Sequence, residues 1–302
     1  MSTTVAPEPS VALADGDAIV EVADVSLSFG GVTSLAGVSL GQRRGEILAV
    51  IGPNGAGKTS LFNCLTGVYT PQAGSIVFHD AKGHDTQVIG RKAHVVNRLG
   101  IARTFQTSRL FNALTAFENV KIGVESRQHT GPVGAMLRLP RTRREERESD
   151  ARSSALLDFV GLHARANEVA SSLPYGDRRR LEIARALGTV PELLLLDEPA
   201  AGTNPSEKVD LAALIRRVNA DMGVSVLLIE HDMRLVMSLA HRIIVLNFGR
   251  VIAAGSPEEI QRNPAVIEAY LGSTGGEGET SGGAADAGGR PDAGGDTRGE
   301  EP

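Results

Sequence analysis

The chain has 302 residues, of which 41% are hydrophobic, and carries a formal net charge of −5; this length allows a sizeable buried core in one or two domains. Residues 272–302 hold seven acidic and two basic side chains, so the body before them is neutral, which argues against non-specific nucleic-acid binding as the main task. No apolar run approaches the roughly 18 residues of a membrane span, and we expect no signal peptide. The single cysteine, Cys64, excludes an internal disulfide and fits a reducing cytosol.

The first half of the chain predicts strands, one glycine-rich loop and one helix. Residues 18–30 alternate loosely between apolar and polar side chains and end in Phe-Gly-Gly, which favours strands and a turn. The apolar run at 45–52 predicts a buried strand that leads into the loop, and residues 58–67 predict a helix that Gly67 closes. A further strand is expected at 73–80, after a Pro/Gly turn.

The second half predicts a helical segment followed by regular strand–helix alternation. Residues from about 115 to 173 are mostly helical in pattern. The alternation that follows comprises a strand at 192–199, a helix at 205–220, a strand at 224–230, a helix from about 233, and a hairpin at 241–255. Such alternation predicts a mainly parallel sheet with helices on both faces, and we expect the helical middle to be inserted between the two halves of that sheet.

Both ends of the chain differ in composition from the middle. Residues 1–17 and the Gly/Asp-rich residues 273–302 hold few apolar side chains, too few to offset the entropy of ordering, so we expect a flexible N-terminus and a disordered tail. Between them we expect one folded domain at 18–272, in which an inserted helical subdomain occupies about 107–187.

A phosphate-binding loop is the most specific motif in the sequence. GPNGAGKT fits the pattern G-x-x-x-x-G-K-[ST] and lies between a predicted strand and a predicted helix. Its glycines let backbone N–H groups surround a phosphate, and the helix start adds partial positive charge. Lys58 would reach the β- and γ-phosphates of a nucleotide, and Thr59 would bind Mg²⁺. The candidate nucleotide-binding residues here are Gly52, Pro53, Asn54, Gly55, Ala56, Gly57, Lys58, Thr59 and Ser60.

Two carboxylates, Asp197 and Glu198, directly follow a run of four leucines. A run so apolar predicts a central, buried strand, and open α/β sheets bind their ligands at the carboxyl ends of such strands. Asp197 can hold Mg²⁺ through water, and Glu198 can polarise an attacking water. An isolated Asp-Glu pair fits a structural turn equally well, but the phosphate-binding loop favours the catalytic interpretation.

Three single residues and one short motif are ambiguous on their own. His231 follows a buried strand, where a histidine is more often structural, and Gln106 in RTFQTSRLF carries no information alone. Phe29 is equally compatible with a core position and with an adenine-stacking ring. The motif LPYGD at 173–177 runs into three arginines and an amphipathic helix, a pattern typical of an anion-binding helix start.

The order of these features resembles the ATP-binding-cassette (ABC) ATPase family over roughly residues 19–272. The resemblance implies an α/β P-loop NTPase fold, with a RecA-like, mainly parallel sheet core, an N-terminal antiparallel β-subdomain and the inserted helical subdomain. It also implies a role for each single residue. Phe29 would stack on adenine, Gln106 would be the Q-loop glutamine and a Mg²⁺ ligand, Asp197 would end Walker B and bind Mg²⁺, Glu198 would be the catalytic base, Asn204 would belong to the nucleotide-binding D-loop, and His231 would be the switch histidine.

LPYGD occupies the place of the family's signature motif, which is commonly L-S-G-G-Q. In this family two cassettes pair head to tail, and the signature of one contacts the ATP of the other. The resemblance therefore adds Leu173, Pro174, Tyr175, Gly176 and Asp177 as nucleotide-contacting residues, with Gly176 allowing close backbone approach. Pro174 departs from the common form because it lacks both a hydroxyl and a backbone N–H.

Together with RRRLEIARAL, GIARTFQTSRLF, LDEPAAGTNP, IEHDM and NPAVIEAYLG, this signature is similar to that of LivG-type ATPase subunits of branched-chain amino-acid importers. The resemblance implies an ATPase that uses ATP and Mg²⁺ at the cytoplasmic face of the membrane. Its implied partners are a sister ATPase or a second copy of itself, permease subunits and, indirectly, an external substrate-binding protein, with no nucleic acid. The alternatives are a lipid, lipopolysaccharide, urea or amide transporter, a non-transport cassette acting on DNA or ribosomes, and a non-hydrolysing nucleotide switch, which Glu198 and His231 disfavour.

Overall fold

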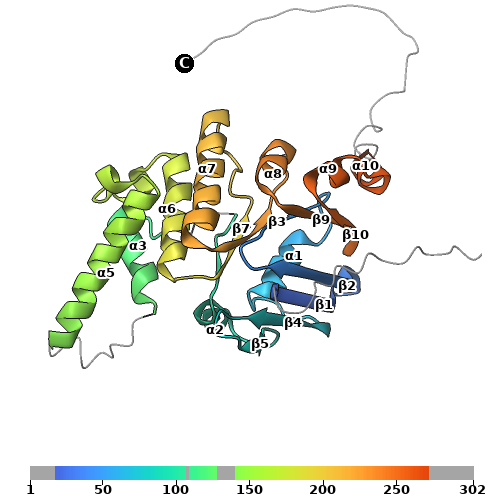
Figure 1. The fold of residues 1–302 in the computed structure, drawn as a ribbon, viewed down its shortest axis with the longest axis horizontal. Helices are drawn as coiled ribbons and strands as arrows, with labels where there is room; N and C mark the ends of the chain where they lie inside the picture. The colour runs from blue at the N-terminus through green and yellow to red at the C-terminus, as the bar shows by residue number, and fades with distance from the viewer. Residues whose placement is uncertain (1–17, 107–108, 128–139, 272–302) are drawn as a thin grey trace, which may run out of the picture.

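The computed structural model describes residues 18–106, 109–127 and 140–271 (Figure 1). The predicted flexible N-terminus at 1–17 and the predicted disordered tail at 273–302 lie outside the described residues. Within the described ranges, none of the helices combines the length and the apolar character needed to cross a bilayer.

An antiparallel sheet forms the N-terminal part, in the strand order β2-β1-β4-β5. Its first two strands make a hairpin in which Gly30 and Gly31 turn the chain at positive φ, as Phe-Gly-Gly predicts. The strands are β1 (Ala18–Phe29), β2 (Val32–Arg43), β4 (Ala73–His79) and β5 (Asp85–Gln87).

A six-stranded, mainly parallel sheet forms the centre, in the order β10-β9-β3-β8-β7-β6. Only β9 and β10 pair antiparallel within it, as the predicted hairpin requires. Every residue of β3, β7 and β8 is buried, which is why their sequences are continuous apolar runs. The strands are β3 (Ile47–Ile51), β6 (Ile101–Arg103), β7 (Leu193–Asp197), β8 (Ser225–Ile229), β9 (Arg242–Asn247) and β10 (Arg250–Gly255).

The helices fall into two groups (Figure 1). Helices α3, α5 and α6 pack on one another to one side of the central sheet, where the helical subdomain is expected. The remaining helices lie along the strands of the two sheets. The helices are α1 (Lys58–Leu65), α2 (Ala93–Leu99), α3 (Ala116–Glu125), α5 (Pro140–Phe159), α6 (Tyr175–Gly188), α7 (Pro205–Met222), α8 (Met233–Leu239), α9 (Pro257–Gln261) and α10 (Pro264–Leu271).

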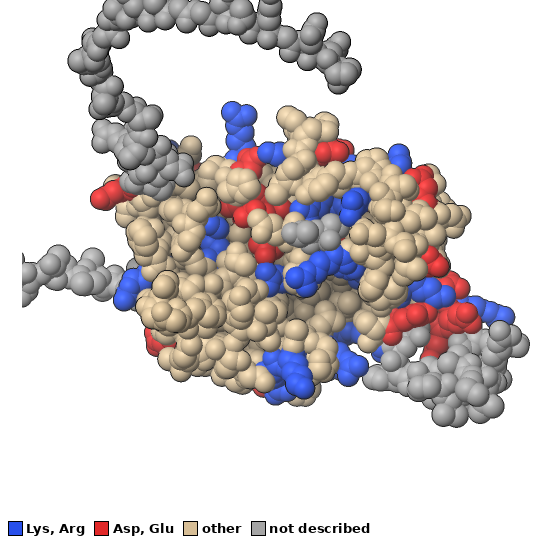
Figure 2. Space-filling model, turned by 180° about the vertical axis from the view of Figure 1, so that it is seen from behind, with Lys and Arg blue, Asp and Glu red and all other residues tan. Residues whose placement is uncertain are grey.

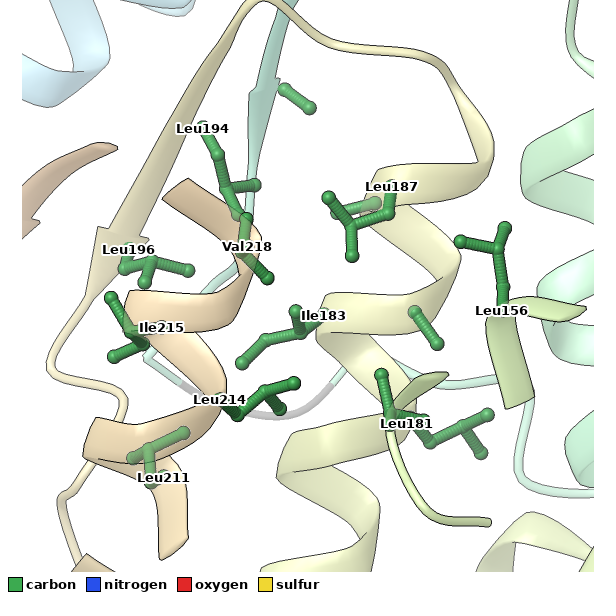
Figure 3. Close-up of a cluster of buried hydrophobic side chains, with 14 of the residues drawn as sticks. Leu156, Leu181, Ile183, Leu187, Leu194, Leu196, Leu211, Leu214, Ile215 and Val218 are labelled. Carbon is green, nitrogen blue, oxygen red and sulfur yellow. The ribbon is translucent and has the colours of Figure 1, made fainter. Parts of the chain in front are cut away.

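A continuous apolar core joins α6, in the first group of helices, to α7 and the central sheet (Figure 3). Its Leu181, Ile183 and Leu187 contact a cluster that also includes side chains of α5, α7 and β7. Burying each such side chain stabilises the fold by about 1.5–3 kcal/mol. The LPYGD motif at the start of α6 therefore belongs to a helix that the apolar core holds in a fixed position.

Candidate nucleotide-binding site

The phosphate-binding loop joins β3 to α1 as the motif predicts. Gly57 caps α1 in the left-handed region at φ 101°, and a Cβ there would lie 2.5 Å from the Ser34 carbonyl oxygen, so only glycine fits. Lys58 is the first residue of α1 and is only 9% exposed. Its Nζ donates to the carbonyl oxygens of Gly52 at 2.7 Å and Pro53 at 2.9 Å, which leaves one of its three donors for a ligand.

Burial lowers the pKa of Lys58, while the nearby carboxylates of Glu198 and Asp197 act to raise it. The sheet register agrees, since Val50 of β3 and Asp197 of β7 both pair with Ile229 of β8, so the phosphate-binding loop and the end of β7 emerge at the same edge of the sheet. The two motifs, about 140 residues apart in the chain, therefore form one site, as expected for strands of a parallel sheet that end at the same edge.

The three predicted catalytic side chains converge at the end of β7. Gln106 Nε2 donates to Glu198 Oε2 at 2.8 Å, and His231 Nδ1 lies 4.0 Å from the same oxygen. Glu198 adopts a left-handed φ of 46°, and its N–H donates to the Ile229 carbonyl oxygen at 2.9 Å. Such backbone strain in a non-glycine residue is concentrated at functional sites.

Asp197 is buried against an arginine that the sequence analysis missed. Arg103 Nη2 donates to Asp197 Oδ2 at 2.6 Å, and Arg103 Nη1 donates to Asn63 Oδ1 at 2.6 Å. Both charged side chains are almost fully buried. Arg103 therefore fixes one oxygen of the predicted Mg²⁺ ligand and ties β6 to β7 and α1.

Arg103→Ala is expected to lower the free energy of unfolding by about 3–5 kcal/mol, because it leaves the Asp197 carboxylate buried without its counter-charge. Urea unfolding of the purified chain measures the loss. Arg144→Ala is the matched control, since Arg144 pairs with Glu148 on an exposed helix face and should leave the midpoint unchanged. Equal midpoints for the two variants would contradict a stabilising role for the Arg103–Asp197 pair.

An aromatic pair lies at the end of β1. Phe29 is 47% exposed and meets Tyr69 edge to face, with 5.1 Å between the ring centroids. The exposure disfavours the core interpretation of Phe29 and fits an open stacking surface. Tyr69 follows α1 and was not predicted, because a single tyrosine in a turn gives no signal.

The LPYGD motif is divided between core and surface. Leu173 is buried in the core around α6, whereas Pro174 caps the helix and Tyr175 is exposed. Gly176 packs against α7, since a Cβ there would lie 2.7 Å from Glu207 Oε1. Asp177 forms ion pairs with Arg165 at 3.3 Å and Arg180 at 3.8 Å, which offset its negative charge.

The three arginines after LPYGD all form hydrogen bonds within the chain. Arg178 Nη2 donates to Asn112 Oδ1, and Arg180 Nη2 donates to Asp210 Oδ2. Arg179 is buried between α6 and the chain around Gln106. These contacts tie α6 to Asn112, to the backbone of Gln106 and to α7.

Two other residues have structural contacts that the sequence did not indicate. Asn204 caps α7, because its Oδ1 accepts from the N–H of Glu207 at 2.9 Å; its predicted contact with nucleotide stays a prediction. Tyr270, in α10, is held near the phosphate-binding loop by a hydrogen bond with the backbone of Gly52, and burial raises the pKa of its hydroxyl.

The fold and this site define an ABC-type ATPase. The chain matches the family described as ABC transporter over residues 35–201, and the family described as branched-chain amino acid ATP-binding cassette transporter over residues 250–275. The chain therefore belongs to the ABC transporter family, which confirms the predicted fold class and the ATPase activity.

Individual proteins of known sequence or structure agree with this family assignment. The chain is 46% identical over 254 residues to the high-affinity branched-chain amino acid transport ATP-binding protein BraF of Pseudomonas aeruginosa and 44% identical over 254 residues to LivG of Escherichia coli; each match covers 84% of this chain and 98% of the relative. A nucleotide-free ATP-binding cassette from an ABC transporter matches with a TM-score of 0.71 and 29% identity, covering 84% of this chain and 98% of that chain. Another cassette, in its ADP conformation, matches with a TM-score of 0.72 and 28% identity, covering 84% and 99%.

Proposed function

We propose that this chain is the ATP-hydrolysing subunit of an importer for branched-chain amino acids, acting at the cytoplasmic face of the membrane. The observation that carries the hydrolytic part is the convergence of Gln106, Glu198 and His231 beside Lys58. The names of BraF and LivG, relatives over most of the chain, support the substrate class.

ATP with Mg²⁺ fits the residues at this site. Lys58 and the backbone of residues 52–57 would hold the β- and γ-phosphates, with the Phe29–Tyr69 pair available to the adenine. Mg²⁺ prefers oxygen ligands and takes one or two protein groups beside the phosphates, and Thr59 and Asp197 are the proposed ligands. The ion would neutralise charge on the phosphates; Gln106 is the third candidate ligand.

Glu198 is the proposed general base. Its carboxylate accepts from Gln106 and would accept a proton from the attacking water, while the strained backbone at Glu198 holds it at the strand end. His231 is 67% exposed in its side chain, so its imidazole is accessible to the γ-phosphate of a bound ATP.

A second cassette would complete the site. Among the described residues, no hydrogen bond or ion pair joins residues 173–177 to residues 52–60, and Pro174 and Tyr175 face solvent. The exposed start of α6 therefore suits the ATP of a partner cassette, either a second copy or a sister subunit. Permease subunits would supply the membrane path, and an external binding protein would deliver substrate.

Gly176→Asp is expected to leave ATP binding by the isolated chain unchanged and to abolish turnover of the assembled transporter. The change adds a negative charge at the start of α6, close to the place proposed for the γ-phosphate of the partner's ATP, and two like charges about 4 Å apart repel by about 4 kcal/mol at an effective dielectric constant near 20. Equilibrium ATP binding and steady-state hydrolysis measure the two effects.

The same carboxylate would also meet Glu207 within the chain. The double variant Gly176→Asp/Glu207→Gln removes that second repulsion and should stay inactive. Recovery of turnover in the double variant would mean that the defect lies between α6 and α7, and not at the partner's nucleotide.

Reconstitution with the permeases and the binding protein tests the proposed function as a whole. ATP-driven uptake of leucine, isoleucine and valine into proteoliposomes is the expected result. Turnover driven only by urea, amides or lipid would reject the substrate class. Nanomolar affinity for duplex DNA at physiological salt, far tighter than the roughly 10⁻⁴–10⁻⁶ M of non-specific binding, would instead favour a non-transport cassette. Figure 2 shows acidic and basic side chains mixed on the face in view, a charge pattern that does not favour DNA binding.

A further inference from the structure

Arg179, near the start of α6, is buried and donates four hydrogen bonds from its guanidinium group. The side chain is 4% exposed. Its Nη1 donates to the Phe105 carbonyl oxygen and to Glu182 Oε2, both at 3.0 Å. Its Nη2 donates to the Gln106 carbonyl oxygen at 2.6 Å and to the Tyr175 hydroxyl at 2.7 Å. All four Nη protons are thus used, two of them on the carbonyl oxygens of Phe105 and Gln106, the two residues called the Q-loop here.

Glu182 completes this arrangement one turn further along α6. It is 3% exposed and neutralises Arg179. Its second oxygen, Oε1, accepts from the N–H of Arg109 at 2.9 Å. One buried ion pair on α6 therefore holds the chain at Phe105 and Gln106 and again at Arg109, and hydrogen-bond networks of this kind restrain the groups that they join.

The contacts of Arg179 lead to both nucleotide-facing parts of the chain. Through the backbone of Gln106 they reach the side chain that donates to Glu198. The bond from Arg179 to the Tyr175 hydroxyl reaches an exposed residue of the signature motif. The Tyr175 ring also lies against the loop after Glu198, since a Cβ at Gly202 would be 3.3 Å from Tyr175 Cε1.

We propose that Arg179 is a positioning residue that couples the signature motif, which faces the partner's ATP, to Gln106 and Glu198, which act on this chain's own ATP. The inference rests on the proposed pairing of two cassettes. When the start of α6 engages the partner's nucleotide, Arg179 transmits the movement to the Gln106 carbonyl and so sets the Gln106–Glu198 hydrogen bond. Hydrolysis at one site then depends on occupancy of the other.

The test is Arg179→Lys in the full transporter. Lysine keeps the charge that Glu182 needs but cannot supply two planar pairs of donors. We expect ATP affinity of the isolated chain within about twofold of wild type, kcat lowered roughly tenfold or more because Gln106 is misplaced, and a Hill coefficient for ATP hydrolysis that falls from above 1 to about 1 as the coupling is lost. Tyr175→Phe, which removes only the hydroxyl, should show the same loss of cooperativity with a smaller loss of kcat.

Arg242→Lys is the matched control, because Arg242 also forms a buried pair, with Glu46, and also donates to a backbone carbonyl, that of Gly41, away from the site. It should keep wild-type kcat and cooperativity. Three results would overturn the inference. The first is unchanged cooperativity in both Arg179→Lys and Tyr175→Phe, and the second is a wild-type Hill coefficient of about 1. The third is an equal defect in Arg242→Lys. A wild-type complex that does not hydrolyse ATP at all would instead reject the proposed function. If Arg179→Lys does not fold, Tyr175→Phe alone decides.

Discussion

Lys58→Ala is expected to abolish ATP binding at concentrations that saturate the wild-type chain. The ammonium is the one positive side chain of residues 52–60, and it is buried with two of its three donors engaged by the Gly52 and Pro53 carbonyl oxygens, which leaves the third for a phosphate. A charge-assisted hydrogen bond contributes about 1.5–3 kcal/mol, and contacts to two phosphates together raise the expected loss of affinity to at least about 100-fold. Isothermal titration of the purified chain with Mg²⁺-ATP measures it.

Lys82→Ala is the control, since Lys82 is exposed in the turn between β4 and β5. It removes the same charge and should leave the dissociation constant for ATP unchanged. A Lys58→Ala chain that is folded and binds ATP within a few-fold of wild type would show that the loop does not hold the phosphates.

Glu198→Gln is expected to retain ATP binding and to lose hydrolysis by a factor of about 10²–10⁴, the usual contribution of a general base. The amide is isosteric and can still accept from Gln106 Nε2, so the geometry of the site should persist. What is lost is the ability to take a proton from water. Phosphate release under single-turnover conditions measures the chemical step directly.

The exposed Glu258 provides the control for this change. Glu258→Gln removes the same charge far from the end of β7 and should hydrolyse ATP at the wild-type rate. Near-wild-type hydrolysis by Glu198→Gln would assign the general base to another group.

The sequence predicted the central sheet well because its strands are extreme in composition. Residues 193–196 are all leucine, and residues 47–51 are all apolar, so burial on both faces was the only compatible structure. The motif at 52–59 then located the site at the carboxyl edge of that sheet. Short elements such as β6 (Ile101–Arg103) and α2 (Ala93–Leu99) were not predicted, because three to seven residues carry too little periodicity.

Side-chain partners were the part of the site that the sequence could not give. Arg103 lies in a three-residue strand, and nothing local indicates that it pairs with Asp197, 94 residues later. Arg179 belongs to a run of three arginines whose pattern favours anion binding, whereas its contacts are with Glu182 and the Q-loop backbone. Both pairings arise from tertiary packing, since only the folded chain brings β6, β7 and α6 together.

In the proposed function, one chain holds the catalytic machinery and a second cassette completes the site. The most direct measurement is the molar mass, by light scattering on a sizing column, of the Glu198→Gln chain with Mg²⁺-ATP, alone and mixed with its sister cassette. Because this variant should bind ATP without hydrolysing it, we predict a complex of two cassettes that appears only with ATP and that Gly176→Asp prevents. A single cassette that binds nucleotide but does not pair, both alone and in the presence of the sister cassette, would contradict the proposed two-cassette site.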